Sequence, residues 1–179
     1  MEIDDVILQK LYLLRHELHA NPELSGNEEK TSGIIKSFLL DFNPSELIEN
    51  IGGHSLLAIF DSGIPGSSVL FRADMDALPI EEKNDIPYRS SNKGIAHLCG
   101  HDGHIAILSG MACLLKRYPP SKGKVMLFFQ AAEETGDGAL LAVEDLTHRN
   151  IKADYCFALH NLPSFKKAAV LFKDGTFAA

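Results

Sequence analysis

Short apolar runs alternate with helical patterns through the second half of the chain, and this alternation constrains the fold more than any other feature. The apolar runs have the length of strands and occupy Ser55–Phe60, Ser67–Arg72, Lys124–Gln130 and Tyr155–Leu159. The last two are continuously apolar, as in buried strands. Helical patterns lie between the later runs, at Gly103–Arg117 and Ala139–Thr147. The alternation predicts an α/β fold, a layered sheet flanked by helices, with a further strand at Ala168–Lys173.

Two helices are predicted before the first strand. Apolar residues recur at helical spacing at Ile7, Leu11, Leu14 and Leu18, which predicts a helix near residues 4–20 that ends at Asn21-Pro22. Ser25, followed three residues later by Glu28, has the pattern of a capping box. It would open a second helix that ends near Asn43-Pro44.

The connections between the apolar runs are also informative. Ser62–Gly66 is rich in Gly, Pro and Ser and lies between the first two runs, which predicts that these two strands pair with each other. The polar segment Ile80–Gly94 predicts a loop.

Composition indicates a globular protein of about one domain. The 179 residues include 17 basic and 24 acidic side chains, a formal net charge of −7. Because clustered Lys and Arg are lacking, nucleic acid and anionic membranes are not expected partners. Three scattered cysteines do not form a disulfide framework. The N-terminus lacks the basic start of a signal peptide, and no apolar stretch has the length of a membrane span, so we expect a cytoplasmic protein.

Polar side chains follow three of the predicted strands at the point where each strand ends. Asp74 and Asp76 follow the second strand, Glu133 and Glu134 follow the third, and His160 follows the fourth. In α/β sheets, side chains just beyond the carboxyl ends of the strands build the functional site. The sequence therefore predicts that these clusters meet at one edge of the sheet.

The segment His97–His104 carries three of the eight histidines and one of the three cysteines. Cys99 and His101 are two residues apart, so in an extended or turning segment both side chains point to the same side and could share a metal ion. Gly100 and Gly103 would let the backbone turn tightly. The alternative is a buried cysteine in a turn whose histidines face solvent, but the density of donors favours a metal site.

The other clusters also have purely structural interpretations. Glu133 and Glu134 can be a solvated pair at the start of a helix, where the dipole favours anions. Asp74 and Asp76 can form a turn before a proline, and His160 can be a hydrogen-bonded residue at the end of a strand. Their shared placement at strand ends favours a site. The remaining histidines lack such a context and are expected on the surface: His16, His19, His54 and His148.

Thiol, imidazole and carboxylate donors together suit a d-block ion such as Zn²⁺ or Mn²⁺. The number of donors suggests two ions, which can activate a water for hydrolysis. In the pair Glu133 and Glu134, one carboxylate could hold metal while the other takes a proton. The sequence patterns of serine hydrolases, nucleotide-binding P-loops and dinucleotide-binding folds do not occur.

Five segments, in order, resemble the metal-dependent amidohydrolases related to aminoacylase and the metallo-carboxypeptidases: RHELHANPELSGNEEKT, FRADMDALPI, HLCGHDGHIAIL, VMLFFQAAEETGDGA and ALHNLP. The nearest branch contains the hippurate hydrolases, N-acyl-amino-acid amidohydrolases and auxin-conjugate hydrolases. The resemblance runs along nearly the whole chain. It implies the front part of a zinc-aminopeptidase-like catalytic domain.

The resemblance also implies a metal site for two divalent ions, Zn²⁺ or Mn²⁺. Four residues correspond to the ligands: Cys99, His101, Glu134 and His160. Cys99 corresponds to the shared thiolate. It would replace the ligand histidine that the wider family often has where this chain has Asp74. Asp102 and His104 belong to the motif without an implied place at the metal.

Two further residues correspond to catalytic groups. Glu133 corresponds to the general base that takes a proton from the metal-activated water and gives it to the leaving amine, and Asp76 to the aspartate that orients the site. The implied reaction is hydrolysis of the amide bond of a small N-acyl amino acid, hippurate-like or N-acetylated. The metals and ligands would stabilise the tetrahedral oxyanion.

Length is where the chain departs from this family. Relatives carry an inserted lid domain that dimerises, followed by a last catalytic segment with one more ligand histidine. We therefore expect residues 1–179 to be the N-terminal portion of the catalytic domain, with apolar edges exposed. An alternative function is a catalytically incompetent metal-binding fragment. A third is thiol chemistry with Cys99 as nucleophile and His101 or His104 as base, which the metal interpretation of these histidines disfavours.

Overall fold

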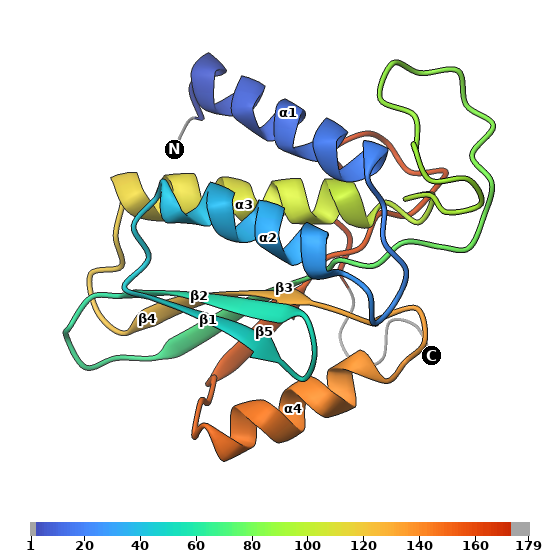
Figure 1. Cartoon of the computed structure of the whole chain (residues 1–179). Helices are drawn as coiled ribbons and strands as arrows, with labels where there is room; N and C mark the ends of the chain where they lie inside the picture. Colours follow the sequence, from blue (N-terminus) through green and yellow to red (C-terminus); the bar gives the residue numbers. More distant parts are fainter. Residues whose placement is uncertain (1–2, 173–179) are drawn as a thin grey trace.

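The computed structural model of the chain describes residues 3–172. Its helices and strands alternate as the sequence predicts, which confirms an α/β fold (Figure 1). The helices are α1 (Asp5–Ala20), α2 (Glu29–Leu40), α3 (His101–Arg117) and α4 (Gly138–His148). The strands are β1 (Glu46–Ile51), β2 (Ser55–Asp61), β3 (Ser68–Asp74), β4 (Lys124–Gln130) and β5 (Tyr155–Ala158). Strand β1 is the element that the sequence analysis missed.

The five strands form one mixed sheet in the order β1-β2-β4-β3-β5. Strands β1, β2 and β4 pair antiparallel, whereas β4, β3 and β5 run parallel. The connection from β3 to β4 and the connection from β4 to β5 move in opposite directions across the sheet. Because such crossovers are right-handed, their helices must lie on opposite faces. Figure 1 shows α3 on one face, together with α1 and α2, and α4 on the other.

Helices on both faces explain the continuous apolar runs in the central strands. Leu127 and Phe129 of β4 join the core beneath α1, α2 and α3, whereas Met126 and Phe128 join a second core beneath α4. Successive side chains of a strand point to opposite faces, so a strand covered on both sides must be apolar at every position. The prediction of a buried strand at Lys124–Gln130 is confirmed.

The prediction that the first two strands pair with each other is wrong. Strand β4 lies between β2 and β3 and pairs with both. The turn 62–66 reverses the chain as a hairpin would, but it spans a gap one strand wide. Strand β4 fills this gap because its apolar side chains can be buried on both faces only in the middle of the sheet.

The N-terminal end of α2 also differs from the prediction of a capping box. The Ser25 hydroxyl donates to Oδ2 of Asp76, at 2.7 Å, and the Glu28 carboxylate accepts from the backbone N–H of Ala132, at 2.7 Å. The carboxylate of Glu23 instead accepts from the backbone N–H of Thr31 at 2.8 Å. The side chains of Ser25 and Glu28 therefore bond to residues far away in the sequence and do not cap the helix.

A strand, β5, forms where the last buried strand was predicted, but its side chains are exposed, so the prediction of burial is wrong. Tyr155 and Phe157 of β5 are 58% and 54% exposed. Strand β5 lies at the edge of the sheet with β3 as its partner, and α4 packs on β1 and β4. The predicted strand at Ala168–Lys173 is also wrong as far as residue 172, where the backbone is irregular, and Lys173 lies outside the described residues.

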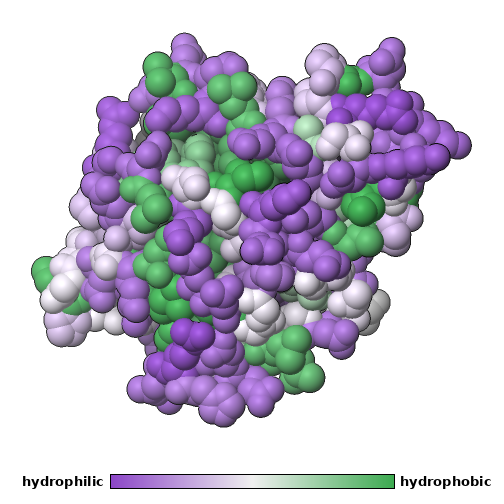
Figure 2. Space-filling view, viewed as in Figure 1, coloured by the Kyte–Doolittle hydropathy of each residue, from purple (hydrophilic) through white to green (hydrophobic). Residues whose placement is uncertain are grey.

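The surface of the described residues is mixed rather than uniformly polar. Figure 2 shows separate hydrophobic patches on a mostly hydrophilic face. Val170 and Phe172, near the end of the described chain, are 86% and 92% exposed. Among residues 3–172, no helix combines the length and apolar character needed to cross a membrane.

Candidate metal centre

The polar clusters at the strand ends meet at the carboxyl edge of the parallel strands, next to the start of α3. Three groups of potential metal donors have their ligand atoms within 4.8 Å of one another. They are Cys99, His101 and Glu134; Asp76, His101 and Glu133; and Asp74, His101, His104 and His160. His101 is common to all three groups. The structure thus brings together every residue predicted for the site, whereas their individual roles stay predictions.

His101 is the first residue of α3, which begins two residues earlier than the predicted start at Gly103. Gly100 precedes it with a φ of 107°, a left-handed conformation that glycine adopts without strain. Nδ1 of His101 lies 2.8 Å from the backbone oxygen of Asp76. Since a carbonyl oxygen can only accept, Nδ1 donates this hydrogen bond. The contact leaves Nε2 as the nitrogen that faces the other donors.

Nε2 of His101 is buried and has no hydrogen-bond partner among the described residues. It lies 3.6 Å from Oε1 of Glu134, 3.7 Å from Oδ2 of Asp74 and 3.9 Å from Oε2 of Glu133. A buried imidazole nitrogen that faces several carboxylates without a hydrogen bond is costly unless a cation lies between them. With the Cys99 thiol beside it, this donor set fits a d-block divalent ion.

Cys99 precedes α3, and of the two predicted forms of this segment, extended or turning, the structure shows the turn. The turn at Gly100 brings the side chains of Cys99 and His101 into one group. Sγ of Cys99 lies 3.5 Å from Nε2 of His160. Burial, together with a hydrogen bond to Glu134 and the charges of the nearby carboxylates, raises the pKa of the Cys99 thiol to about 12. A divalent cation in the cluster would oppose these effects and favour the thiolate.

Glu133 and Glu134 lie in the turn between β4 and α4. This turn is fixed at Ala132, which has a positive φ of 53° and whose N–H donates to buried Glu28. The two side chains are 38% and 23% exposed. Both carboxylates face the buried ring of His101, and Glu133 is the more accessible to solvent. A carboxylate at this position can exchange protons with water at the rim of the site.

Asp76, two residues after β3, links three other parts of the fold. Its Oδ2 accepts from the Ser25 hydroxyl at 2.7 Å and from the Glu134 backbone N–H at 2.8 Å. Burial opposes ionisation of Asp76, but hydrogen bonds from His101, Ser25 and Glu134 outweigh it and lower the pKa of the carboxyl. The side chain of Asp76 therefore connects the N-terminal segment to the turn that follows β4, and its backbone oxygen connects both to α3.

His19 is the main residue of this region that sequence reasoning misjudged, because it is buried and not on the surface. Its Nδ1 lies 2.9 Å from Oδ2 of Asp102, and its Nε2 lies 3.1 Å from Oε1 of Glu82. Both carboxylates are buried, and Arg15 also donates to Asp102 at 3.0 Å. A signal was present in the sequence: positions 15 and 19 lie beside Leu11 and Leu18 on the apolar face of the helix.

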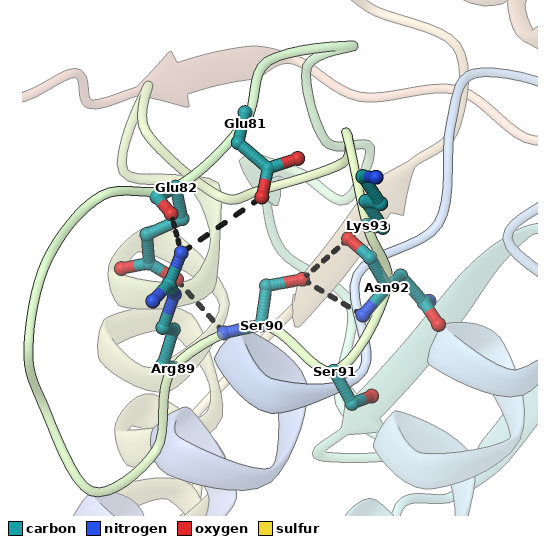
Figure 3. Close-up of a pocket in the computed structure, with 7 residues that line it drawn as sticks. All are labelled: Glu81, Glu82, Arg89, Ser90, Ser91, Asn92 and Lys93. Carbon is teal, nitrogen blue, oxygen red and sulfur yellow. Dashed lines mark hydrogen bonds and ion pairs between the residues drawn. The ribbon is translucent and has the colours of Figure 1, made fainter.

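The loop 80–94, confirmed as irregular, is attached to α1 by this network and by Tyr88. The Tyr88 ring stacks on the ring of His16, with 3.7 Å between centroids. Within the loop, the Arg89 guanidinium donates to the backbone oxygen of Glu82 and lies 3.8 Å from the carboxylate of Glu81 (Figure 3). These residues line a polar hollow of about 290 Å³. The loop is therefore a folded unit that leads the chain to the metal-binding segment.

Comparison with known proteins agrees with this geometry. Residues 70–173, more than half of the chain, match the peptidase family M20/M25/M40. The chain belongs to this family. The matched M20/M25/M40 region contains all the donors described above. Membership confirms the resemblance to metal-dependent amidohydrolases and metallo-carboxypeptidases that the five segments indicate.

Individual members of the M20/M25/M40 family are similar over nearly all of this chain. The N-acetyl-L-cysteine deacetylase of Bacillus subtilis is 41% identical over 96% of the chain, and the hippurate hydrolase of Campylobacter jejuni is 35% identical over 93%. The crystal structure of the Bacillus subtilis YXEP protein, described as a dinuclear metal binding peptidase, superposes on 90% of the chain with a TM-score of 0.83 and 33% identity. The chain spans 41%, 43% and 45% of these three proteins.

Proposed function

We propose that this chain is the N-terminal portion, residues 1–179, of the catalytic domain of a metal-dependent hydrolase that cleaves the amide bond of N-acyl amino acids. One observation carries the proposal. The buried Nε2 of His101, without a hydrogen-bond partner, faces the carboxylates of Glu133 and Glu134 in a cluster that includes the Cys99 thiol. Relatives named for deacetylation of N-acetyl-L-cysteine and for hydrolysis of hippurate support this substrate class.

Cys99, His101, Glu134 and His160 would hold two divalent ions, Zn²⁺ or Mn²⁺. When bound, such ions polarise the amide carbonyl and lower the pKa of the attacking water. Asp76 keeps His101 in place, because its backbone oxygen accepts from Nδ1 of that ring. A member of the family described as dinuclear supports the pair of ions.

Glu133 is assigned as the general base. Its side chain is 38% exposed and its carboxylate lies 3.9 Å from Nε2 of His101, at the solvent side of the cluster. From there it can take a proton from the attacking water and deliver it to the leaving amine. Glu134 is less suited, because its backbone N–H is bonded to Asp76 and its carboxylate lies nearer to His101, at 3.6 Å.

Release of free amino acid from N-acetyl and N-benzoyl amino acids, with Mn²⁺ or Zn²⁺ added, tests the proposal. We expect Glu133→Gln to retain the metal and to lower turnover by about 10²–10⁴-fold. His148 is exposed at the last position of α4 and belongs to none of the three donor groups, so His148→Ala is the control variant, with turnover unchanged. Metal binding without turnover by the unaltered chain would instead support the alternative, a metal-binding fragment without activity of its own.

A further inference from the structure

His104 lies one helical turn after His101 and is 2% exposed, but the proposed function gives it no task. Its Nδ1 lies 2.6 Å from Oδ1 of Asp74. The other oxygen of Asp74 accepts from the Arg72 guanidinium at 2.9 Å, and the Nε of Arg72 donates to Gln130 at 3.1 Å. The fully buried carboxylate of Asp74 is thus fixed by the sheet and in turn fixes the ring of His104.

The other nitrogen of His104 contacts the segment that follows β5. Nε2 lies 2.6 Å from Oδ1 of Asn161 and 3.2 Å from the backbone nitrogen of the same residue. Nε2 cannot donate to Oδ1 and accept from the backbone N–H at the same time, but either hydrogen bond ties the ring to Asn161. Because Nδ1 of the same ring contacts Asp74, the ring links Asn161 to the end of β3.

Gly100 provides a second contact surface for Asn161. A Cβ atom at Gly100 would lie 2.4 Å from Oδ1 of Asn161, closer than any real contact allows. The absence of a side chain at position 100 therefore lets Asn161 lie directly against the turn that begins α3. Asn161 is held between this turn and His104, two parts of the chain next to the proposed ligands Cys99 and His101.

The residue before Asn161 is His160, another proposed ligand. His160 is exposed, and it follows a short edge strand whose side chains are also exposed. Its Nε2 lies 3.5 Å from Sγ of Cys99, and its Nδ1 lies 2.8 Å from the backbone oxygen of Asn161. The position of His160 beside Cys99 therefore depends on how firmly Asn161 is held.

We propose that His104, held by Asp74 and Arg72, is a positioning residue that places His160 at the metal centre by holding Asn161 against Gly100. This inference rests on the proposed metal site. It separates two roles within one histidine-rich segment: His101 binds metal, and His104 holds the strand end that supplies the other imidazole. Both ring nitrogens of His104 have partners, which distinguishes it from His101 with its unpartnered Nε2.

Cobalt binding by the metal-free chain tests the inference. We expect His104→Ala and Asn161→Ala each to raise the Co²⁺ dissociation constant about 10–100-fold, the usual effect of removing a residue that supports a ligand. The paramagnetically shifted NMR signals of the His160 ring, assigned by their loss in His160→Ala, should weaken or vanish in both variants. Asn161 is exposed, so Asn161→Ala keeps the test valid if His104→Ala folds poorly. His148→Ala serves as the matched control.

Double variants separate positioning from ligation. If His104 acts through His160, adding His104→Ala to His160→Ala should change the Co²⁺ dissociation constant less than about 2-fold. A further loss of tenfold or more would show that His104 acts independently of His160, as a ligand would, and would overturn the inference. Unchanged affinity and unchanged His160 signals in both single variants would overturn it as well. Failure of the unaltered chain to bind Co²⁺ would overturn the proposed metal site itself.

Discussion

Nδ1 of His101 lies 2.8 Å from the backbone oxygen of Asp76, and this hydrogen bond turns Nε2 of the same ring toward the carboxylates of the site. The nitrogen that would bind metal is therefore oriented by the main chain at the end of β3. Because the backbone, and not a flexible side chain, accepts this hydrogen bond, the orientation of the His101 ring does not require a bound ion.

Removing the central donors should abolish metal binding. After incubation with Mn²⁺ or Zn²⁺ and desalting, we expect about two ions per chain by elemental analysis, as for a two-metal site. His101→Ala removes the one residue common to all three donor groups, and Cys99→Ser removes the thiol. Both variants should lose most of the bound metal, whereas His148→Ala should retain it. Parental metal content in both variants would show that the site is assigned to the wrong residues.

The buried contacts of His19 should contribute strongly to stability. Its two ring nitrogens lie 2.9 Å and 3.1 Å from carboxylate oxygens of Asp102 and Glu82. The carboxylates of Asp102 and Glu82 are themselves buried, at 0% and 2% exposed, so they depend on partners within the fold. His19→Leu would leave two buried carboxylates with fewer partners, and we expect a loss of about 3–5 kcal/mol in the free energy of unfolding, measured with urea. The exposed variant His148→Ala should change it by less than about 0.5 kcal/mol. A similarly small change in His19→Leu would contradict the proposed importance of the network.

Glu82 should make the stability of the chain depend on pH in the acidic range. Burial opposes ionisation, but the Ser90 N–H, His19 and Asn84 donate to the carboxylate and lower its pKa below the ordinary 4.5. The unfolded chain therefore binds a proton at higher pH than the folded chain. The stabilisation is complete well above pH 4.5 and is lost as the pH falls below it. Urea unfolding of Glu82→Gln should show a weaker pH dependence than the parent. Parallel curves for the two proteins would refute the assignment.

The sequence predicted which polar clusters come together in the fold better than it predicted the contacts that hold them. The clusters at Asp74, Glu133 and His160 could be identified because parallel strands place their carboxyl ends at one edge. The neighbours of each strand could not, since β2 and β3 are separated by β4 through packing on both faces of the sheet. Similarly, His19 meets Asp102 across 83 positions of the chain, which local periodicity does not report.

Gly123 should tolerate substitution poorly, because its Cα lies against the backbone that precedes β3. Gly123 has a φ of +67°, and a Cβ there would lie 2.1 Å from the backbone oxygen of Ser67, next to the start of β3. Gly63 has a similar φ of +72° but open space around it, so it is a matched control. We expect Gly63→Ala to cost about 1 kcal/mol from backbone strain alone, and Gly123→Ala to cost more than about 2 kcal/mol. Equal losses of stability in Gly63→Ala and Gly123→Ala, measured by thermal or urea unfolding, would show that the backbone around Ser67 can move away from position 123 at little cost.

The cysteines should differ in reactivity in the folded, metal-free chain. Cys156 is exposed on β5, whereas Cys113 is 9% exposed inside α3. Burial raises the pKa of the Cys113 thiol to about 11, and burial with nearby carboxylates raises that of Cys99 to about 12. A thiol with a raised pKa has less of the reactive thiolate at a given pH. With iodoacetamide followed by peptide mass spectrometry, we expect Cys156 to be modified first and Cys113 only after unfolding. Equal rates for Cys113 and Cys156 in the folded chain would contradict this burial.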